Sequence, residues 1–229
     1  MPVTQAIIFD CDGVLVDSEV LAQEVELAAL AEVGLTYDRA DFQTRFMGMS
    51  NDSFFAALEA DSHRQLGRAL PANFRESCHN RYAGFVRERL VEVPGAAAAI
   101  SPISHPRAVA SSSEIPILET KLRKTGLWEY FAPHVYSANH VARSKPAPDL
   151  FLHAAAELGA EARQCIVLED SANGVLAARA AGMTVWGFMG GSHMDAASGR
   201  RLLAAGANRL VRDWAEAGAL LSNLPVATR

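Results

Sequence analysis

Short runs of apolar residues recur along the chain, and the first of them ends in acidic residues. The run at 6–9 is followed directly by Asp10, Cys11 and Asp12. A continuous run without alternation is typical of a strand that is buried on both faces, as in parallel sheets. Further runs of this kind lie at 108–110, 165–168 and 184–188, with a weaker one at 135–136. These five segments predict the strands of a parallel sheet.

Helical patterns separate the predicted strands. We expect helices over 117–127, 148–158 and 172–181, the last two closed by Gly159 and Gly182. Glycine just past a helix end is the usual stop signal. Strands that alternate with helices of this length indicate βα units around a parallel sheet. The predicted fold class is therefore α/β, with a Rossmann-like, doubly wound parallel sheet as its core.

Residues 17–88 break this alternation. Apolar residues at helical spacing predict one helix that ends at Gly34, a short one from Asp38 or Asp41, a third from Asp52 and a fourth from Pro71. Because this segment follows the first strand, we interpret it as a lid over the carboxyl edge of the sheet, where α/β proteins bind ligands. The predicted domains are a discontinuous core, 1–16 and 89–229, and an all-helical cap domain, 17–88, with hinges at 13–17 and 90–94.

Composition and charge then narrow the function classes. The chain has 229 residues, 50% of them apolar, and a formal net charge of −5. It lacks the basic footprint of a nucleic-acid binder, and no apolar run approaches the ~20 residues of a membrane span. Its three separated cysteines give neither a disulfide framework nor a zinc ligand set. We expect a soluble, cytoplasmic protein that is a monomer or a weak homodimer.

Residues able to carry chemistry gather where the predicted strands end. Because the carboxyl ends of parallel strands meet at one edge of a sheet, four carboxylates, a lysine and several hydroxyls are expected in one crevice. The side chains of Asp10 and Asp12 share one side of an extended chain, since side chains alternate there with period two. In chain order the candidate residues are Asp10, Asp12, Ser111, Ser112, Ser113, Lys145, Glu169 and Asp170.

Four carboxylates in one crevice need compensating positive charge. Two like charges about 4 Å apart repel by about 4 kcal/mol at an effective dielectric constant of ~20. Protons or a divalent cation must therefore be taken up. Oxygen ligands favour Mg²⁺, which takes one or two carboxylates and binds substrate phosphate. A carboxylate beside a metal can also attack phosphorus and form an aspartyl-phosphate.

The segment Asp10-Cys11-Asp12-Gly13-Val14-Leu15-Val16-Asp17-Ser18 resembles the first motif of the haloacid dehalogenase superfamily. The other three motifs follow in family order, at Ser111, at Lys145 before Pro146, and at Glu169-Asp170. The inserted helices resemble the first type of cap in that family. The segments around Asp17, Lys145 and Asp170 are most similar to the branch that contains β-phosphoglucomutases and phosphoglycolate phosphatases.

The resemblance implies a role for each matched position. Asp10 would be the nucleophile and a metal ligand. Asp12 would be the general acid and base, with its backbone carbonyl on the metal. Asp170 would ligate the metal, with Glu169 as a direct or water-mediated partner.

The remaining two motifs, at Ser111 and Lys145, would bind the phosphate. The implied reaction is Mg²⁺-dependent hydrolysis of a small phosphorylated metabolite, such as a sugar phosphate or a sugar-acid phosphate.

One departure from the family pattern bears on the reaction. In the β-phosphoglucomutases a cap histidine restrains the acid/base aspartate and a cap arginine grips a distal phosphate, and the matching positions here are Ala22 and Asn51. Both absences favour a phosphatase over a sugar-phosphate mutase. Arg45 and Asn51 remain candidates for substrate contacts in the cap.

Two further classes stay as alternatives. A dehalogenase needs no metal and lacks the second aspartate, which is present here as Asp12. A phospho-acceptor signalling module also combines acids, a hydroxyl and a lysine, but it is much shorter and has no inserted cap.

Locally, Ser113 and Ser171 are interpreted as helix N-caps. Six of the seven histidines, His193 among them, show no metal-ligand spacing.

Overall fold

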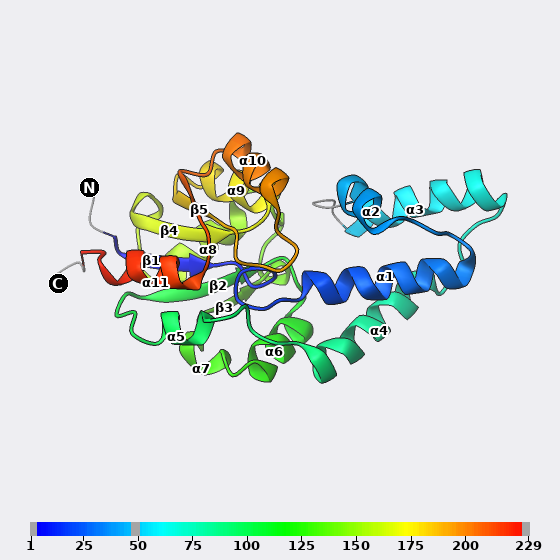
Figure 1. The fold of residues 1–229 in the computed structure, drawn as a ribbon. Coiled ribbons are helices and arrows are strands. Elements are labelled where there is room, and N and C mark those ends of the chain that lie inside the picture. Colours follow the sequence, from blue (N-terminus) through cyan, green and yellow to red (C-terminus); the bar gives the residue numbers. More distant parts are fainter. Residues whose placement is uncertain (1–3, 47–50, 226–229) are drawn as a thin grey trace. The chain divides into compact units, whose positions relative to one another are not determined.

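The computed structural model describes residues 4–46 and 51–225. The chain divides into two compact units, which Figure 1 shows as a sheet-containing part and a helical part. Met1–Glu19 and Arg89–Arg229 form the first unit, and Val20–Glu88 forms the second. Among the described residues, no helix has both the length and the apolar character that crossing a membrane requires.

A six-stranded parallel sheet forms the centre of the first unit (Figure 1). Its order is β3-β2-β1-β4-β5-β6, so the chain winds outward in both directions from β1 and the predicted doubly wound sheet is confirmed. All five predicted strands are present, and β6 is an addition that the pattern did not predict. The strands are β1 (Ala6–Phe9), β2 (Arg107–Ser111), β3 (Val135–Ser137), β4 (Cys165–Glu169), β5 (Thr184–Phe188) and β6 (Arg209–Val211).

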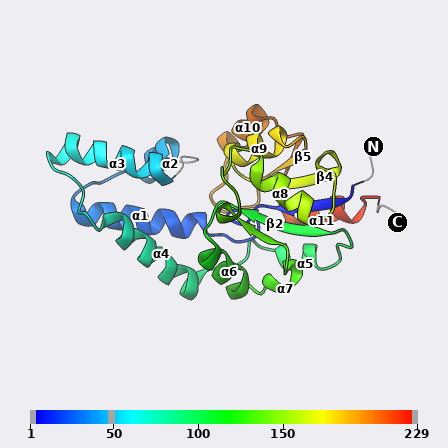
Figure 2. The same cartoon turned by 180° about the vertical axis from the view of Figure 1, so that it is seen from behind.

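Helices cover both faces of this sheet (Figures 1 and 2). One face carries α8 (Asp149–Glu157), α9 (Ala172–Ala180) and α10 (Ala196–Ala205). The other carries α5 (Ala96–Ile100), α6 (Ile115–Lys124), α7 (Trp128–Phe131) and α11 (Trp214–Ser222). Two short 3₁₀ helices, η1 (Ala138–His140) and η2 (Ala162–Gln164), lie in the connections.

The central strand explains why its sequence shows no alternation. Ile8 belongs to the apolar cluster under α8 and α9, whereas the ring of Phe9 packs on Phe131 and Trp214 on the opposite face. Both faces of β1 are therefore buried, so both sets of side chains must be apolar.

The helices differ from their predicted limits in one informative place. Those predicted over 148–158 and 172–181 are confirmed within two residues, and Ser171 caps α9 by accepting from the Gly174 amide. The helix predicted over 117–127 instead begins at Ile115, with Glu114 as its N-cap. The interpretation of Ser113 as an N-cap is wrong, because its hydroxyl donates to Asp12 instead.

The second unit is built from helices that pack around aromatic rings. They are α1 (Glu19–Val33), α2 (Arg39–Phe46), α3 (Asn51–Leu66) and α4 (Phe74–Arg89). Phe42 and Phe46 pack with ring centroids 4.8 Å apart, and both contact Phe54. Leu30, Leu58 and Phe74 belong to the same buried cluster, so these helices pack on one another through apolar side chains.

A buried carboxylate lies beside the aromatic core of the helical unit. The side chain of Asp61 is 0% exposed and accepts hydrogen bonds from Tyr37 (2.7 Å) and Arg45 (2.6 Å). Arg64 also pairs with it. Burial favours the neutral acid, but the hydrogen bonds and the two guanidinium charges outweigh it and lower the pKa of Asp61.

Two segments of the first unit connect it with the helical unit, and they are hydrogen-bonded to each other. The Asp17 amide donates to the Val91 carbonyl (3.1 Å), and the Val93 amide donates to the Leu15 carbonyl (2.9 Å). The buried indole N–H of Trp214 donates to the Val14 carbonyl (2.9 Å). The loop that follows β1 is thus held both by the returning segment and by α11.

Two helical glycines should respond to alanine in opposite ways. Alanine in a helix interior is ordinarily more stable than glycine by about 0.5–1 kcal/mol. No atom lies within 4 Å of a Cβ built on Gly84 in α4, so Gly84→Ala should raise the unfolding temperature. A Cβ on Gly174 in α9 would lie 1.7 Å from Oε1 of the buried Glu169, so Gly174→Ala should destabilise by about 1–3 kcal/mol. Thermal unfolding followed by circular dichroism tests both, and stabilisation by Gly174→Ala would contradict the packing described for Glu169.

Asp61→Asn should destabilise the protein in a pH-dependent manner. Because the folded pKa of Asp61 lies below its unfolded value, its ion pairs contribute stability above the unfolded pKa, and this is lost as the pH falls through the folded pKa. The variant should unfold at a lower temperature at pH 7, and its difference from the wild type should shrink below about pH 5. Asp52→Asn, which breaks an exposed pair with Arg75, is the matched control and should change little. A difference that stays constant with pH would refute the ionic contribution.

Candidate active site

The centre of the sheet brings the predicted residues to one edge. β1 ends at Phe9, where the strand order reverses, and its neighbours β2 and β4 end at Ser111 and Glu169. In open α/β sheets, ligands bind outside the carboxyl ends of the strands at such a point. Asp10 therefore begins the loop that lies at the position best suited to a ligand site.

Lys145 joins two of the predicted carboxylates. Its Nζ donates to Asp10 Oδ1 (2.5 Å), to Glu169 Oε1 (2.7 Å) and to the carbonyl of Ala110 (2.9 Å). These three bonds use all three ammonium protons. Burial would lower the pKa of Lys145, but the charges and hydrogen bonds of Asp10 and Glu169 raise it above its ordinary value. Lys145 is thus a cation at any physiological pH.

The pKa of Asp10 stays raised although Lys145 donates a hydrogen bond to it. Burial raises the pKa of Asp10 well above its ordinary value, and Glu169, Asp170 and Asp12 raise it further, while Lys145 alone opposes them. Asp10 therefore lies among more negative charge than Lys145 neutralises, which favours uptake of a proton or a cation.

Asp12 accepts four hydrogen bonds, two on each carboxylate oxygen. Oδ1 accepts from Ser18 (2.5 Å) and from Lys121, and Oδ2 accepts from Ser113 (2.8 Å) and Ser111 (3.3 Å). Burial would raise the pKa of Asp12, but Lys121 and the two hydroxyls of Ser18 and Ser113 lower it to about 2. Asp12 is therefore ionised in the ligand-free protein.

Sequence reasoning missed Lys121 because it belongs to none of the four motifs. One signal was available, since Lys121 stands on the apolar stripe of α6 with Leu118 and Leu122, at the i, i+3 and i+4 positions. A lysine on the buried face of a helix requires an anionic partner.

A histidine that sequence reasoning also missed lies against Asp170. His193 Nε2 is 3.1 Å from Asp170 Oδ2, and both side chains are less than one-tenth exposed. Burial would lower the pKa of His193, but its hydrogen bond and charge interaction with Asp170, helped by Glu19 and Asp17, raise it. The available signal was its position in the loop that follows β5, at the same sheet edge.

Glycines allow this histidine to approach the loop after β1. Gly13 has a φ of +72°, and a Cβ there would lie 1.8 Å from Asp170 Oδ2. A Cβ on Gly191 would lie 2.7 Å from the Gly13 carbonyl oxygen. Ser192 adds a hydrogen bond from its amide to Asp17 (3.1 Å), so the loops after β1 and β5 are packed together.

The donor set fits a magnesium ion held partly by water. Among residues 4–46 and 51–225, no three His, Cys, Asp or Glu side chains converge as a protein-only metal cage would require. Asp10 and Asp170 could supply two carboxylates and Asp12 a backbone carbonyl, which matches the preference of Mg²⁺. Glu169 is less suited to direct contact, because Lys145 binds its Oε1 and Ser171 binds its Oε2 through both amide and hydroxyl.

Arg45 and Asn51 are the two residues of the cap that the sequence predicted as substrate contacts. The Arg45 guanidinium is engaged by Asp61 and packs 4.9 Å from the ring centroid of Phe46, so its contacts lie within the helical unit. Asn51 is the first residue of α3, and its side chain lies outside the described part of the structure.

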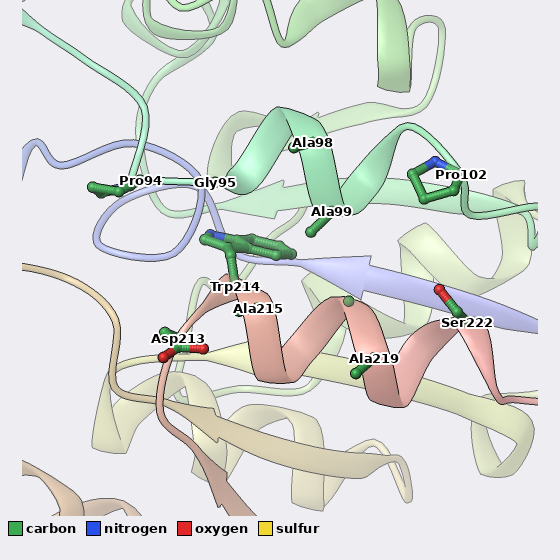
Figure 3. A pocket seen from close by; sticks show the side chains of 11 residues that line it. Pro94, Gly95, Ala98, Ala99, Pro102, Asp213, Trp214, Ala215, Ala219 and Ser222 are labelled. Carbon is green, nitrogen blue, oxygen red and sulfur yellow. The ribbon is translucent and has the colours of Figure 1, made fainter.

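A groove of about 590 Å³ lies elsewhere on the first unit, between α5 and α11. Figure 3 shows Trp214 between the two helices, with Pro94, Gly95 and Ala99 along one side. Asp213 is the one charged residue in its lining, and none of the motif residues contributes to it. This groove is therefore not the candidate active site.

Comparison with known proteins agrees with the motif pattern. Residues 4–182 match the family model of the haloacid dehalogenase-like hydrolases. The chain is 32% identical to fructose-1-phosphate phosphatase of Escherichia coli (strain K12), over 77% of this chain and 92% of that protein. It is 29% identical to 6-phosphogluconate phosphatase of the same organism, over 82% of this chain and 84% of that protein.

Solved structures are similar over almost the whole chain. A conserved haloacid dehalogenase-like protein from Agrobacterium tumefaciens superimposes with a TM-score of 0.86 at 36% identity, covering 96% of this chain and 98% of that one. A family hydrolase from Deinococcus radiodurans R1, with bound phosphate and sodium, has a TM-score of 0.81 at 34% identity, covering 98% and 99%. The chain belongs to the haloacid dehalogenase-like hydrolase family.

Proposed function

We propose that this hydrolase is a Mg²⁺-dependent phosphatase that cleaves a small phosphorylated metabolite through an aspartyl-phosphate on Asp10. The substrate class is a sugar phosphate or sugar-acid phosphate, in keeping with relatives named as fructose-1-phosphate, 6-phosphogluconate and hexitol phosphatases. The observation that carries the proposal is the position of Asp10, buried at the sheet centre and held through one oxygen by Lys145.

Asp10 is suited to nucleophilic attack because its orientation is fixed. Lys145 holds Oδ1, so we assign the attack to Oδ2. In this step the bond between Oδ2 and phosphorus forms and the bond between phosphorus and the leaving oxygen breaks. Lys145 and the Ser111 hydroxyl would each exchange one of their present hydrogen bonds for one to the phosphoryl oxygens, where charge accumulates.

Asp12 is suited to proton transfer on both halves of the reaction. It would pass a proton to the leaving oxygen, and then take one from the water that hydrolyses the aspartyl-phosphate. Since four donors keep Asp12 ionised in the free protein, the first proton would arrive with the monoanion of the phosphate ester. Asp12 then passes the water proton to the departing phosphate or to solvent, so the products are the alcohol and inorganic phosphate with both aspartates regenerated.

Asp10, Asp170 and the Asp12 carbonyl would hold the magnesium ion. When bound, Mg²⁺ supplies charge that neutralises the carboxylates and draws electron density from the phosphoryl oxygens. The helical unit, Val20–Glu88, would serve as a cap that excludes water during the reaction and admits substrate between turnovers.

Phosphate release from a panel of metabolites tests the proposed function. Fructose 1-phosphate, 6-phosphogluconate and hexitol phosphates should release inorganic phosphate with Mg²⁺, measured by a colorimetric phosphate assay. Chelation of the metal with EDTA should reduce the rate by at least about 10²-fold, and excess Mg²⁺ should restore it.

The same enzyme preparation distinguishes a phosphatase from a mutase and from a phospho-acceptor module. With β-glucose 1-phosphate and a bisphosphate activator, formation of glucose 6-phosphate without equivalent phosphate release would favour a sugar-phosphate mutase and contradict the proposal. Phosphorylation that stops after a single event per chain would favour a phospho-acceptor signalling module.

Asp10→Asn should abolish turnover and leave the fold intact. The amide keeps the size of the side chain but removes the nucleophilic oxygen, so kcat should fall by about 10³-fold or more. The matched control is Asp149→Asn, which breaks an ion pair with the exposed Arg143 at the start of α8 and should keep wild-type activity. Unchanged activity in Asp10→Asn, with an unchanged circular dichroism spectrum, would overturn the mechanism.

A further inference from the structure

Lys121 is a buried cation that the reaction outlined above leaves without a role. Its side chain is 2% exposed, although an ammonium group is rarely found in the protein interior without a counter-charge. Its Nζ donates to Asp12 Oδ1 and to the Ser113 hydroxyl oxygen (2.9 Å). Helix α6 therefore carries a charged contact directly to Asp12.

These contacts close a ring around the Asp12 carboxylate. Lys121 donates to Oδ1 and to Ser113, and Ser113 in turn donates to Oδ2 (2.8 Å). Both oxygens of Asp12 are thereby tied to one anchor on a regular helix. Because the carboxylate is held at two points, rotation about its terminal torsion would break at least one charge-assisted hydrogen bond.

The two lysines of the site serve different aspartates. Lys145 reaches Asp10 and Glu169, whereas Lys121 reaches Asp12 and Ser113. Lys121 comes from α6, and Lys145 comes from the connection before α8. Each of the two aspartates of the first motif thus has a buried cation of its own.

We propose that Lys121 is a positioning residue that, together with Ser113, orients the Asp12 carboxylate to accept the proton of the hydrolytic water. This inference rests on the proposed function and concerns its second half, in which the aspartyl-phosphate is hydrolysed. There the bond between Asp10 and phosphorus breaks, a bond from the water oxygen to phosphorus forms, and the water proton passes to Asp12. To accept this proton Asp12 would exchange one of its four hydrogen bonds, such as the longest one from Ser111 (3.3 Å), for the water, while Lys121 and Ser113 keep the carboxylate in place.

p-Nitrophenyl phosphate isolates the step in question. Its leaving group departs without needing a proton, so formation of the aspartyl-phosphate does not depend on Asp12, whereas hydrolysis still does. Stopped-flow measurement at high enzyme concentration gives the first-turnover release of p-nitrophenolate and the later steady-state rate from one trace.

Lys121→Met keeps the length of the side chain and removes its charge. It should lower the steady-state rate by about 10²-fold and change the first-turnover rate by less than about threefold, so that a burst of one p-nitrophenolate per enzyme appears. Lys121→Arg, which keeps the cation, should recover part of the steady-state rate. Ser113→Ala, which opens the ring from the other side, should show the same separation of rates to a smaller degree.

The matched control is Lys124→Met, since Lys124 is exposed on the same helix and should behave as wild type. Equal loss of both rates in Lys121→Met, or no loss in either, would overturn the positioning role while the wild type stays active. If Lys121→Met does not fold, Ser113→Ala decides the question by the same two rates. A wild-type enzyme that hydrolyses no phosphate ester would instead refute the proposed function.

Discussion

The structure depends above all on the compensation of like charges at the carboxyl edge of its sheet. The parallel arrangement brings Asp10, Asp12 and Glu169 to the centre of one edge, and Asp170 directly follows β4. Such a cluster repels itself strongly wherever water is excluded. Buried cations from other parts of the first unit, and a histidine against Asp170, reduce this repulsion without removing it. The remaining negative charge is what suits the site to a divalent cation.

Close backbone approaches make this compensation possible. Gly174 allows Glu169 to lie under the start of α9, and Gly13 allows Asp170 and His193 to approach the loop after β1. The indole N–H of Trp214 also fixes this loop, because it donates a hydrogen bond to the Val14 carbonyl. The charged groups are thus oriented by packing as well as by their own attraction, as a preorganised site requires.

Burial raises the pKa of both Asp10 and Asp12, but their partners set the final direction of each shift. Asp10 is raised in pKa because burial and neighbouring carboxylates outweigh one lysine, whereas Asp12 is lowered because a lysine and two hydroxyls outweigh burial. The pKa values of two aspartates only two positions apart in the chain are therefore shifted in opposite directions. An ionised nucleophile at Asp10 requires the opposite shift, so a cation bound beside it would have to supply the missing positive charge.

Much of the architecture could be predicted from the pattern of apolar residues. The strands were found because a strand buried on both faces must be a continuous apolar run, as Ile8 and Phe9 illustrate. β6 was missed because Arg209–Val211 is a short strand at the sheet edge, where one neighbour is absent and the chain need not be apolar. The N-cap of α6 was misassigned because Ser113, a good helix cap in isolation, is bound to Asp12, and Glu114 occupies the cap position.

The sequence by itself determined the fold class and the positions of the four motifs. The fold class follows from the local pattern of apolar residues, and the motifs follow one another at the ends of the predicted strands. It could not reveal Lys121 or His193 as partners of the motif residues. Lys121 lies 109 positions from Asp12 along the chain, and His193 belongs to a loop with no ligand spacing. Only the tertiary structure decided these pairings, because the cost of burying a charge depends on which groups packing brings within a few ångströms of it.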